Sequence, residues 1–533
     1  TILHFYIQRD FMTQNYDPNT QKRLLAVVAF SFLFFVLYDY FFIPKPPPRT
    51  ENNTTVREQT NTSPAPLLSS LMPSISSDED APKVTPTDAL VIINGEFYDI
   101  YIDNLGRISQ MHVKNNVYDD VNLLSAQFVK PAEVRFSSPA INKEAFQVSY
   151  TTEQSQVALN ERASFTITQA LTDMTVRKHF TFNKDGTYSV QIDLSKEEAY
   201  FITPGYRPDA EIDGFAFHGT LLQLEDETLE LLEDGDFTSS FTFTNSKIVA
   251  GVDKYFTTMF YDFDKGLSGV VDTYTDESPL AFVRGAHAQV FNGYIGEKNY
   301  LHLDSIDKRL TKVIEYGFIT FVAKPIFTIL AFLHTYIGNW GWSIVALTIL
   351  IRIIMYPLTY KGMVSMNKIK ELAPKVKEIQ EKHKDDKQRS SAAMMELYKK
   401  HGANPMGGCL PFILQIPIFF AIYRTLLNAI ELKGSEWIFW INDLSVQDPY
   451  FILPVLMGAS MFLQQHLTPS TITDPMQQKI FKYLPAVFTL FFLTFAAGLV
   501  LYWLVNNLFS IVQQYYINRV FAKKKLEASA HNK

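Results

Sequence analysis

The sequence predicts a multi-domain membrane protein: an α-helical membrane core of five helices and an N-terminal anchor helix, combined with a large antiparallel β-sandwich domain. Three observations predict this fold class. Hydrophobic residues make up 47% of the 533 residues while charged residues still make up 19%, so apolar and polar parts must be segregated along the chain. Long apolar stretches cluster near the N-terminus and in the C-terminal part. Between them, about 200 residues follow the period-two alternation of β-strands.

The first apolar stretch predicts a transmembrane anchor at 24–43. It follows Lys22 and Arg23, which places the preceding segment 1–23 in the cytosol. A cleaved signal peptide is the alternative, but the aromatic end of the stretch and the lack of a following A-x-A pattern favour an uncleaved anchor. Residues 44–88 are rich in Pro, Ser, Thr and Asn and predict a disordered linker.

Residues 89–305 predict an antiparallel β-sandwich on the far side of the membrane. Alternating segments such as SFTITQAL and TYSVQIDL are separated by Asn-Gly and Asp-Gly pairs, which are typical of turns. The histidines of this domain show no metal-ligand spacing such as HExxH. A binding or spacer role is therefore expected rather than an active site. The single cysteine, Cys409, excludes an intramolecular disulfide.

The stretch 306–342 is apolar enough for a membrane span but is interrupted by Lys324, Pro325 and His334. If it crossed the membrane, the following helix would run outward and deliver the basic segment after it to the outside, against the positive-inside rule. We therefore expect an amphipathic helix lying in the membrane interface.

The charges of the loops predict the order of the remaining segments. The segment after the first core helix carries about eleven Lys or Arg and two helix-period stretches joined by a polar turn at 384–387, with Gly402 as the stop of the second. The predicted boundaries are transmembrane helix 2 at 343–359, a cytosolic helical hairpin at 360–408, transmembrane helix 3 at 409–429, an external loop at 430–449, transmembrane helix 4 at 450–467, a cytosolic loop at 468–482, transmembrane helix 5 at 483–497, transmembrane helix 6 at 498–518 and a basic cytosolic tail at 519–533.

A charged residue in the middle of helix 343–359 is the most informative feature of the core. Arg352 at this depth costs roughly 2.5 to 3.5 kcal/mol on insertion scales. Residues spaced by four lie on one face of a helix, and two helices carry polar residues at this spacing. Because intramembrane polar side chains usually face the protein interior, these two stripes and a polar residue on a third helix predict a hydrophilic groove. They are Thr348, Arg352 and Tyr356 on one helix, Tyr502, Asn506, Ser510 and Gln514 on the last, and Gln415 on the third.

Three alternatives to a groove remain at this point. The polar side chains could bond one another across tightly packed helices. Arg352 could also snorkel toward the cytosol or pair with Asp39, since the last five predicted spans contain no Asp or Glu. In a cavity open to the cytosol, the charge would instead attract acidic or polar segments that must cross the membrane. No nucleophile with a base, phosphate loop or ligand cluster indicates an enzyme, and no cofactor or metal is expected.

The C-terminal half of the chain resembles a known family. The segments LTILIRIIMYPLT, NPMGGCLPFILQIPIFFAIY, TDPMQQKIFKYLPAVFTLFF and GLVLYWLVNNLFSIVQQ closely resemble the YidC branch of the YidC/Oxa/Alb membrane protein insertases. The match covers about residue 306 to the C-terminus. The anchor, linker and β-domain resemble the Gram-negative form, in which the β-domain is periplasmic. The resemblance implies an energy-independent insertase and chaperone of the cell inner membrane, working alone or beside the Sec translocon through a cytosol-open groove.

The resemblance also implies site residues and partners. By motif position, the groove arginine maps to Arg352, the substrate-contacting threonine to Thr348 and the groove glutamine to Gln415. The paired tyrosines map to Tyr502 and Trp503, and the second aromatic residue lacks a hydroxyl. The predicted substrate groove therefore comprises Arg352, Thr348, Tyr356, Gln415, Tyr502, Trp503, Asn506 and Ser510.

The implied partners are nascent membrane proteins, the Sec translocon, membrane lipids, and the ribosome or signal-recognition machinery at the hairpin and basic tail. Nucleic acid is not expected as a specific ligand. The alternative function is a polytopic transporter or channel with an external ligand-binding domain, for which inverted repeats would be the signature. A tethered sugar-processing enzyme is a third hypothesis, and it would require clustered His and acidic residues in the β-domain.

Overall fold

The computed structural model describes residues 89–114, 119–125, 127–209, 216–274, 277–383, 386–403, 410–467 and 475–531. The predicted N-terminal segment 1–23, the anchor at 24–43 and the linker at 44–88 lie outside the described residues. Asp39, one candidate partner of Arg352, lies outside them as well.

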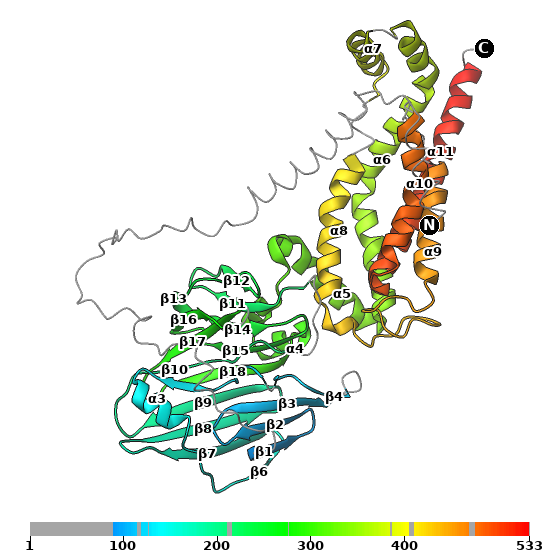
Figure 1. The fold of residues 1–533 in the computed structure, drawn as a ribbon. Helices are drawn as coiled ribbons and strands as arrows, with labels where there is room; N and C mark the ends of the chain where they lie inside the picture. The colour runs from blue at the N-terminus through cyan, green and yellow to red at the C-terminus, as the bar shows by residue number, and fades with distance from the viewer. Residues whose placement is uncertain are drawn as a thin grey trace, which may run out of the picture. The chain divides into compact units, whose positions relative to one another are not determined.

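The β-domain contains three sheets (Figure 1). Their strand orders are β4-β3-β2-β1-β6, β13-β16-β17-β10-β5 and β12-β11-β14-β15-β18-β9-β8-β7. The elements are β1 (Ala89–Gly95), β2 (Tyr98–Asp103), β3 (Ile108–Lys114), β4 (Asp119–Asn122), β5 (Val134–Phe136), α3 (Pro139–Ala145), β6 (Gln156–Leu159), β7 (Arg162–Ala170), β8 (Thr175–Asn183), β9 (Thr187–Leu194), β10 (Tyr200–Ile202), β11 (Gly219–Gln223), β12 (Leu229–Glu233), β13 (Phe241–Ser246), β14 (Ile248–Val252), β15 (Phe256–Tyr261), β16 (Leu267–Thr273), β17 (Pro279–Gly285) and β18 (Val290–Glu297).

The pairing pattern confirms the predicted class of β-domain, with one addition. Neighbouring strands in the described sheets pair antiparallel except β1 and β6, which pair in parallel with Ile92 opposite Gln156. A parallel pair requires a crossover connection, and here the chain between the two strands forms β2 to β5 and α3. The alternating pattern of β1 alone does not reveal this long-range partner.

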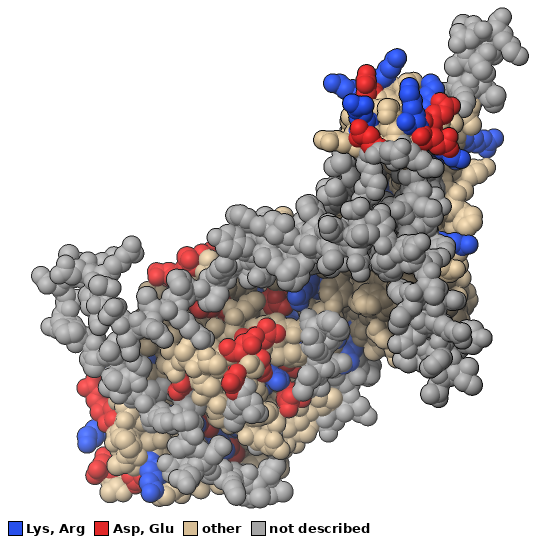
Figure 2. All heavy atoms as spheres, turned by 45° about the horizontal axis from the view of Figure 1, so that its top comes forward, with Lys and Arg blue, Asp and Glu red and all other residues tan. Residues whose placement is uncertain are grey.

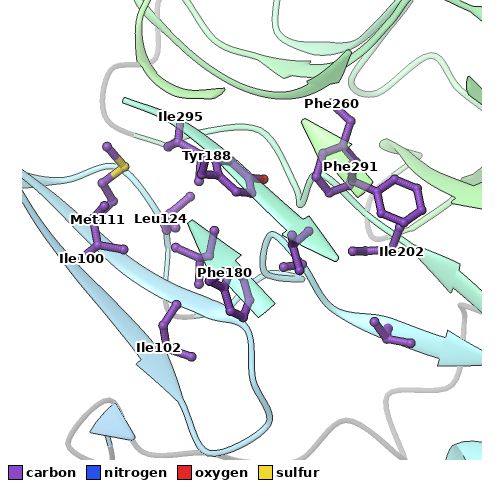
Figure 3. Packing of buried hydrophobic residues seen from close by; sticks show 14 of the residues in the cluster. Ile100, Ile102, Met111, Leu124, Phe180, Tyr188, Ile202, Phe260, Phe291 and Ile295 are labelled. Carbon is purple, nitrogen blue, oxygen red and sulfur yellow. The ribbon is translucent and has the colours of Figure 1, made fainter. Parts of the chain in front are cut away.

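Alternation also builds the core between the sheets. Along β7, every second residue is buried, as the period of two requires. Figure 3 shows Ile100 and Met111, from β2 and β3, lying against Phe180 and Tyr188 from β8 and β9. Many of the apolar residues predicted from the sequence pattern therefore join a large core, and a smaller separate cluster contains Val129, Phe201, Tyr206, Val270, Leu280 and Phe282.

A network of buried charges lies inside this domain. Arg107 donates from Nε to Asp103 Oδ2 at 2.8 Å and from Nη1 to Glu133 Oε2 at 3.0 Å. Lys178 is 1% exposed and donates from Nζ to the carbonyl oxygens of Gly106 at 2.8 Å and Ala132 at 2.9 Å. Burial lowers the pKa of the Lys178 ammonium to about 7.

The helical elements follow the β-domain in the chain. They are α4 (Tyr300–Ile306), η2 (Lys308–Val313), η3 (Gly317–Ile319), α5 (Thr320–Ile337), α6 (Trp340–Lys382), α7 (Lys387–Lys400), α8 (Leu410–Asn428), η5 (Ile430–Leu432), α9 (Ile452–Leu467), α10 (Pro475–Phe492) and α11 (Ala497–His531). Helix α11 packs along both α6 and α9, α9 packs against α10, and α8 packs against α5, so the helices form a bundle (Figure 1).

Helix α6 is longer than the predicted span at 343–359. It begins after Asn339, whose side chain accepts a hydrogen bond from Trp342 N, and it continues through Pro357 to Lys382. The membrane part and the first helix of the hairpin are therefore one continuous helix. Proline normally favours a break in the interior of a helix, which is why the sequence pattern alone indicated an end there.

The hairpin consists of the C-terminal part of α6 and α7. Asp386 caps α7 by accepting hydrogen bonds from the backbone N–H groups of Gln388 and Arg389, at the polar turn that the sequence predicts. Gly402 follows α7 with φ +58°, a conformation that favours glycine. A small core of Ile369, Leu372, Val376 and Ala403 joins the two helices, and both basic and acidic side chains cover the outside (Figure 2).

Two helices within the described residues are long and apolar enough to cross a membrane, by length and composition. They are α5 and α6. Helix α9 and the part of α10 from Lys482 to Phe492 are apolar but shorter. The interfacial position of 306–342 stays a prediction, because α5 meets the same criterion as α6. The long apolar stretch 483–518 is divided between Phe492 and Ala497, and α11 continues into the basic tail.

Lys178 predicts a pH-dependent contribution to the stability of the β-domain. The folded state lowers its pKa from that of an ordinary lysine to about 7, so the unfolded chain binds more protons between about pH 7 and pH 10. Over this range, the free energy of unfolding of the β-domain should rise with pH more steeply in the wild type than in Lys178→Met. Urea titrations read by pulse proteolysis would measure both slopes. Identical slopes would show that the buried lysine keeps an ordinary pKa.

Candidate functional site

The centre of the candidate site is the contact between Arg352 on α6 and the polar face of α11. Arg352 donates from Nε to Asn506 Oδ1 at 2.7 Å and from Nη2 to Ser510 Oγ at 2.7 Å. Nη2 also donates to the Asn506 carbonyl oxygen at 3.2 Å. All three residues are buried. The two polar stripes that the spacing predicts therefore meet, and three donors of the guanidinium are used.

The charge of Arg352 has no carboxylate beside it. The apolar parts of α6 and α8 to α11 contain no Asp or Glu in the sequence, and no described residue forms an ion pair with Arg352. Its Nη1 group has no acceptor among the residues that the structure describes. Arg352 is thus an oriented cation that neutral groups hold and that retains free donor capacity.

The absence of Asp and Glu from the predicted spans does not leave Arg352 without a partner inside the bundle. An amide and a hydroxyl on the facing helix take this place. Asn506 and Ser510 satisfy donors of the guanidinium without neutralising its charge. Hydrogen bonding among polar side chains across packed helices, the alternative to a wet groove, is what the structure shows at this point.

The contact between α6 and α11 extends beyond Arg352 as a polar seam. Gln513 donates from Nε2 to Thr359 Oγ1 at 2.7 Å, and Asn367 donates from Nδ2 to Asn518 Oδ1 at 3.0 Å. Gln514 also donates to Asn518 Oδ1, at 2.8 Å. We name the α6–α11 polar seam after the residues Arg352, Thr359, Asn367, Asn506, Ser510, Gln513 and Asn518.

The seam includes Thr359 and Asn367, which are not among the predicted groove residues. Thr359 and Asn367 follow Arg352 at seven and fifteen positions, which places them close to its face of the helix. This spacing could have indicated that Thr359 and Asn367 belong to the same polar face, but the predicted helix ended at residue 359. The continuous α6 brings both residues against α11.

Thr348, Gln415 and Tyr502 are three further residues of the predicted groove. Gln415 of α8 donates from Nε2 to the Tyr502 hydroxyl oxygen at 2.7 Å, so a third helix contributes a polar contact. The Thr348 hydroxyl donates to the carbonyl oxygen of Ile344 in its own helix. Thr348 and Tyr502 are each only 1% exposed. The described state therefore has these two side chains covered.

Tyr356 and Trp503 lie apart from this polar cluster. Tyr356 is exposed, one turn beyond Arg352 on the same helix. Trp503 packs among aromatic rings, with its ring centroid 4.9 Å from that of Phe419 and 5.4 Å from that of Phe492. The indole Nε1 of Trp503 is buried without a hydrogen-bond partner within the described part of the chain. Trp503 is adjacent to Tyr502 in sequence, but it points to a different side of α11.

The arrangement suits the binding of polar groups rather than bond chemistry. Its members are one cation, amides and hydroxyls, and no general base lies among the contacts of Arg352. No group of three or more His, Cys, Asp or Glu in the described ranges could hold a metal ion. The site can orient donors toward an acceptor-bearing segment within an apolar surrounding.

Comparisons with known proteins show the family of the chain. Residues 332–525 match the family model described as 60Kd inner membrane protein. The "Membrane protein insertase YidC" of Campylobacter jejuni is 50% identical over 95% of this chain and 97% of its own length. The protein of the same name from Wolinella succinogenes is 49% identical over 97% of this chain and 99% of its own length. The protein of the same name from Helicobacter pylori strain 26695 is 46% identical over 95% of this chain and 97% of its own length.

Solved structures show a weaker likeness. "Active YidC insertase crystal structure with the first transmembrane domain resolved" is similar with a TM-score of 0.39 and 18% identity, and covers 82% of this chain and 94% of that chain. The crystal structure of YidC from Thermotoga maritima has a TM-score of 0.32 at 15% identity, and covers 80% of this chain and 99% of that chain. Likeness at this level supports no inference. The near-complete coverage at about half identity in three bacteria is decisive, and the chain belongs to the YidC family of membrane protein insertases.

Proposed function

We propose that this protein inserts newly made proteins into the bacterial inner membrane and assists their folding, and that Arg352 receives polar parts of the substrate on their way across. The single observation that carries the role of Arg352 is its guanidinium, buried and held by Asn506 and Ser510, with no carboxylate beside it among the described residues. The full-length relatives named as insertases support the activity.

An uncompensated cation in an apolar surrounding lowers the cost of bringing a polar segment into the membrane. Coulomb attraction at a given distance grows as the dielectric constant falls, so Arg352 acts more strongly on an acidic group here than it would in water. The unused Nη1 donors can bond a substrate carboxylate or carbonyl oxygen without displacing any existing contact. A substrate segment thus gains hydrogen bonds that it otherwise loses on leaving water.

Neutral partners make the contact exchangeable. A carboxylate partner would add the Coulomb attraction of opposite charges to its hydrogen bond with the guanidinium, and an amide or hydroxyl oxygen does not. Had an Asp stood at position 506, the pair would neutralise the charge and compete with the substrate. Asn506 and Ser510 orient Arg352 while leaving its charge available.

We further propose that Thr348 and Tyr502, which are covered, and Gln415, which is partly buried, become accessible to a substrate when α8 moves away from α6 and α11. Thr348 and Tyr502 are 1% exposed, and the Gln415 to Tyr502 hydrogen bond links α8 to α11. Breaking this one hydrogen bond would free two polar side chains for the substrate. The predicted hydrophilic groove is then a state that the substrate opens.

The proposed setting is the inner membrane of a Gram-negative bacterium, with several spans, the β-domain in the periplasm and no catalytic chemistry. The hairpin of α6 and α7 has its own small core and carries more basic than acidic residues, so it can serve as a docking surface for the ribosome or signal-recognition machinery. The Sec translocon and membrane lipids complete the proposed partners. The basic segments beyond the apolar helices support their placement in the cytosol.

Substitution of Arg352 tests its electrostatic role. Arg352→Glu should impair insertion of a substrate with an acidic translocated tail more than the same substrate with a neutral tail, because the charge now repels the tail. Arg352→Lys keeps the charge but loses the planar guanidinium with its several donors, so it should retain part of the insertion activity on the substrates with either tail. Protease protection in liposomes that contain only this protein measures insertion. Equal losses for acidic and neutral tails with Arg352→Glu would contradict the proposal.

Site-specific crosslinking tests the path of the substrate. A photocrosslinker at Tyr356 or Tyr502 should form adducts with a ribosome-bound nascent chain of a single-spanning protein. Ile354 provides the matched control, because it lies on the same helix as Tyr356 and is exposed on another face. Adducts at Ile354 but at neither tyrosine would place the substrate on the outer surface of the bundle instead.

A further inference from the structure

The loop that joins α8 to α9 lies where several helices of the bundle begin. We call residues 433–451 the α8–α9 loop. Its Trp437 ring lies 5.6 Å from that of Trp342 in the first turn of α6, measured between centroids. Ala497 and Gly498, which begin α11, donate their N–H groups to the carbonyl oxygens of Val446 at 2.7 Å and Leu444 at 2.9 Å. The loop is thus attached to the first turns of α6 and α11 and leads directly into α9.

A buried carboxylate gives the loop a defined shape. Asp448 is buried and accepts three hydrogen bonds. Trp440 Nε1 and Tyr450 N donate to Oδ1, each at 3.0 Å, and Leu453 N donates to Oδ2 at 2.6 Å. The carboxylate therefore holds Trp440 in place and satisfies an N–H group of the first turn of α9. The hydrogen bonds to Asp448 therefore hold in place the part of the loop that carries the aromatic side chains.

Several large side chains of the α8–α9 loop are exposed on the surface of the protein. Phe439 is 85% exposed and Tyr450 is 68% exposed, and Val446 and Phe451 are exposed as well. The ring of Phe439 stacks on that of Trp440 at 5.9 Å between centroids. We name the residues Phe439, Trp440, Val446, Tyr450 and Phe451 the aromatic patch.

Two members of the patch have strained backbones. Phe439 has φ 54° and Phe451 has φ 56°, in the left-handed region that bulky residues rarely adopt. Such a conformation costs of order 1 to 3 kcal/mol, and glycine or asparagine would adopt it with less strain. The strain does not help bury Phe439, since its side chain is the most exposed in the patch. A strained and exposed aromatic residue indicates a contact outside the chain.

We propose that the aromatic patch inserts into the lipid bilayer, at the level of the glycerol groups and upper acyl chains. Continuity with the lipid-facing surface favours lipid over a protein partner. The patch leads without a gap into α9, whose next exposed residues are Ile452, Val455 and Leu456. Tyr and Trp concentrate at the membrane interface because one end of each side chain is apolar and the other is polar.

The charge of the loop defines the kind of lipid contact. Its Lys, Arg, Asp and Glu residues are Lys433, Glu436, Asp443 and Asp448, so acidic residues outnumber basic ones and the loop does not attract anionic headgroups. Insertion therefore depends on the burial of apolar surface and should occur in zwitterionic phospholipid without a basic partner.

The patch would set the depth of Arg352 in the membrane. The contact between Trp437 and Trp342 ties the patch to the first turn of α6. From Trp342 to Arg352, a helix rises about 15 Å, which is about half the hydrocarbon thickness of a bilayer. Fixing the interface level at the α8–α9 loop holds the guanidinium near the middle of the bilayer.

Spin labels at single cysteines test the proposal. In a Cys409→Ser background, nitroxides are attached to Phe439→Cys and Tyr450→Cys, and the protein is reconstituted in phosphatidylcholine vesicles. The ratio of collisions with oxygen to collisions with a water-soluble nickel chelate reports depth. Val290→Cys on β18 is the control for water, and Val455→Cys on α9 is the control for lipid, since both native residues are exposed and apolar.

Labels at 439 and 450 should give ratios between those of the two controls and clearly above that of Val290→Cys. A ratio equal to that of Val290→Cys would place the loop in water and overturn the proposal. Protection from both reagents would indicate a protein contact and would overturn it as well. A low ratio at Val455→Cys would instead contradict the placement of α9 in the membrane, on which the proposal rests.

A second variant separates lipid contact from folding. Phe439→Asn suits the left-handed backbone and removes the apolar ring, so the fold should be kept. In this variant, the ratio at the Tyr450→Cys label should shift toward the value for water. An unchanged ratio would show that Phe439 does not hold the loop in the lipid.

Discussion

The hydrogen bonds from Arg352 to Asn506 and Ser510 are the interaction on which the proposed mechanism depends. A guanidinium within an apolar helix must be hydrogen-bonded, because an unpaired buried charge is strongly destabilising. Here α11 supplies a carbonyl oxygen, an amide oxygen and a hydroxyl. The same contacts join the two helices that continue together along the polar seam. The hydrogen bonds that hold the charged group in place therefore also hold α6 and α11 together.

Arg107, a buried arginine of the β-domain, has partners of a different kind from those of Arg352. Arg107 is enclosed by Asp103 and Glu133, so its charge is neutralised and serves the domain itself. Within the described part of the chain, Arg352 has only neutral hydrogen-bond partners, and in the proposed mechanism its charge stays available to a substrate. This difference within one chain supports a static role for the first arginine and a binding role for the second. The proposed insertion of the aromatic patch into lipid would then set the depth of Arg352 in the bilayer.

The sequence predicted much of this arrangement because helical spacing is local information. The polar faces of Arg352 and of Asn506 with Ser510 follow from steps of four, and the β-domain follows from its alternation. The division of the last apolar stretch into two helices was predicted near Ala496, and α11 begins at Ala497.

Other features depend on contacts between distant segments. The parallel pairing of β1 with β6 and the contact of Asn367 with Asn518 join residues far apart in the chain, so no local pattern specifies them. The ring packing of Trp503 likewise depends on how α11 is rotated against α8 and α10. The strained backbones of Phe439 and Phe451 could not be predicted, because residues of this type rarely adopt them.

A double-mutant cycle between α6 and α11 tests the central interaction most directly. The free energies of unfolding of Arg352→Met, Ser510→Ala and the double variant are measured in lipid by steric trapping. The account predicts a coupling energy of about 0.5 kcal/mol or more, as is typical for residues in contact. Arg352→Met with Asn507→Leu is the control and should be additive, because Asn507 bonds Ser460 of α9 instead. Additive effects of the Arg352 and Ser510 substitutions would contradict the account.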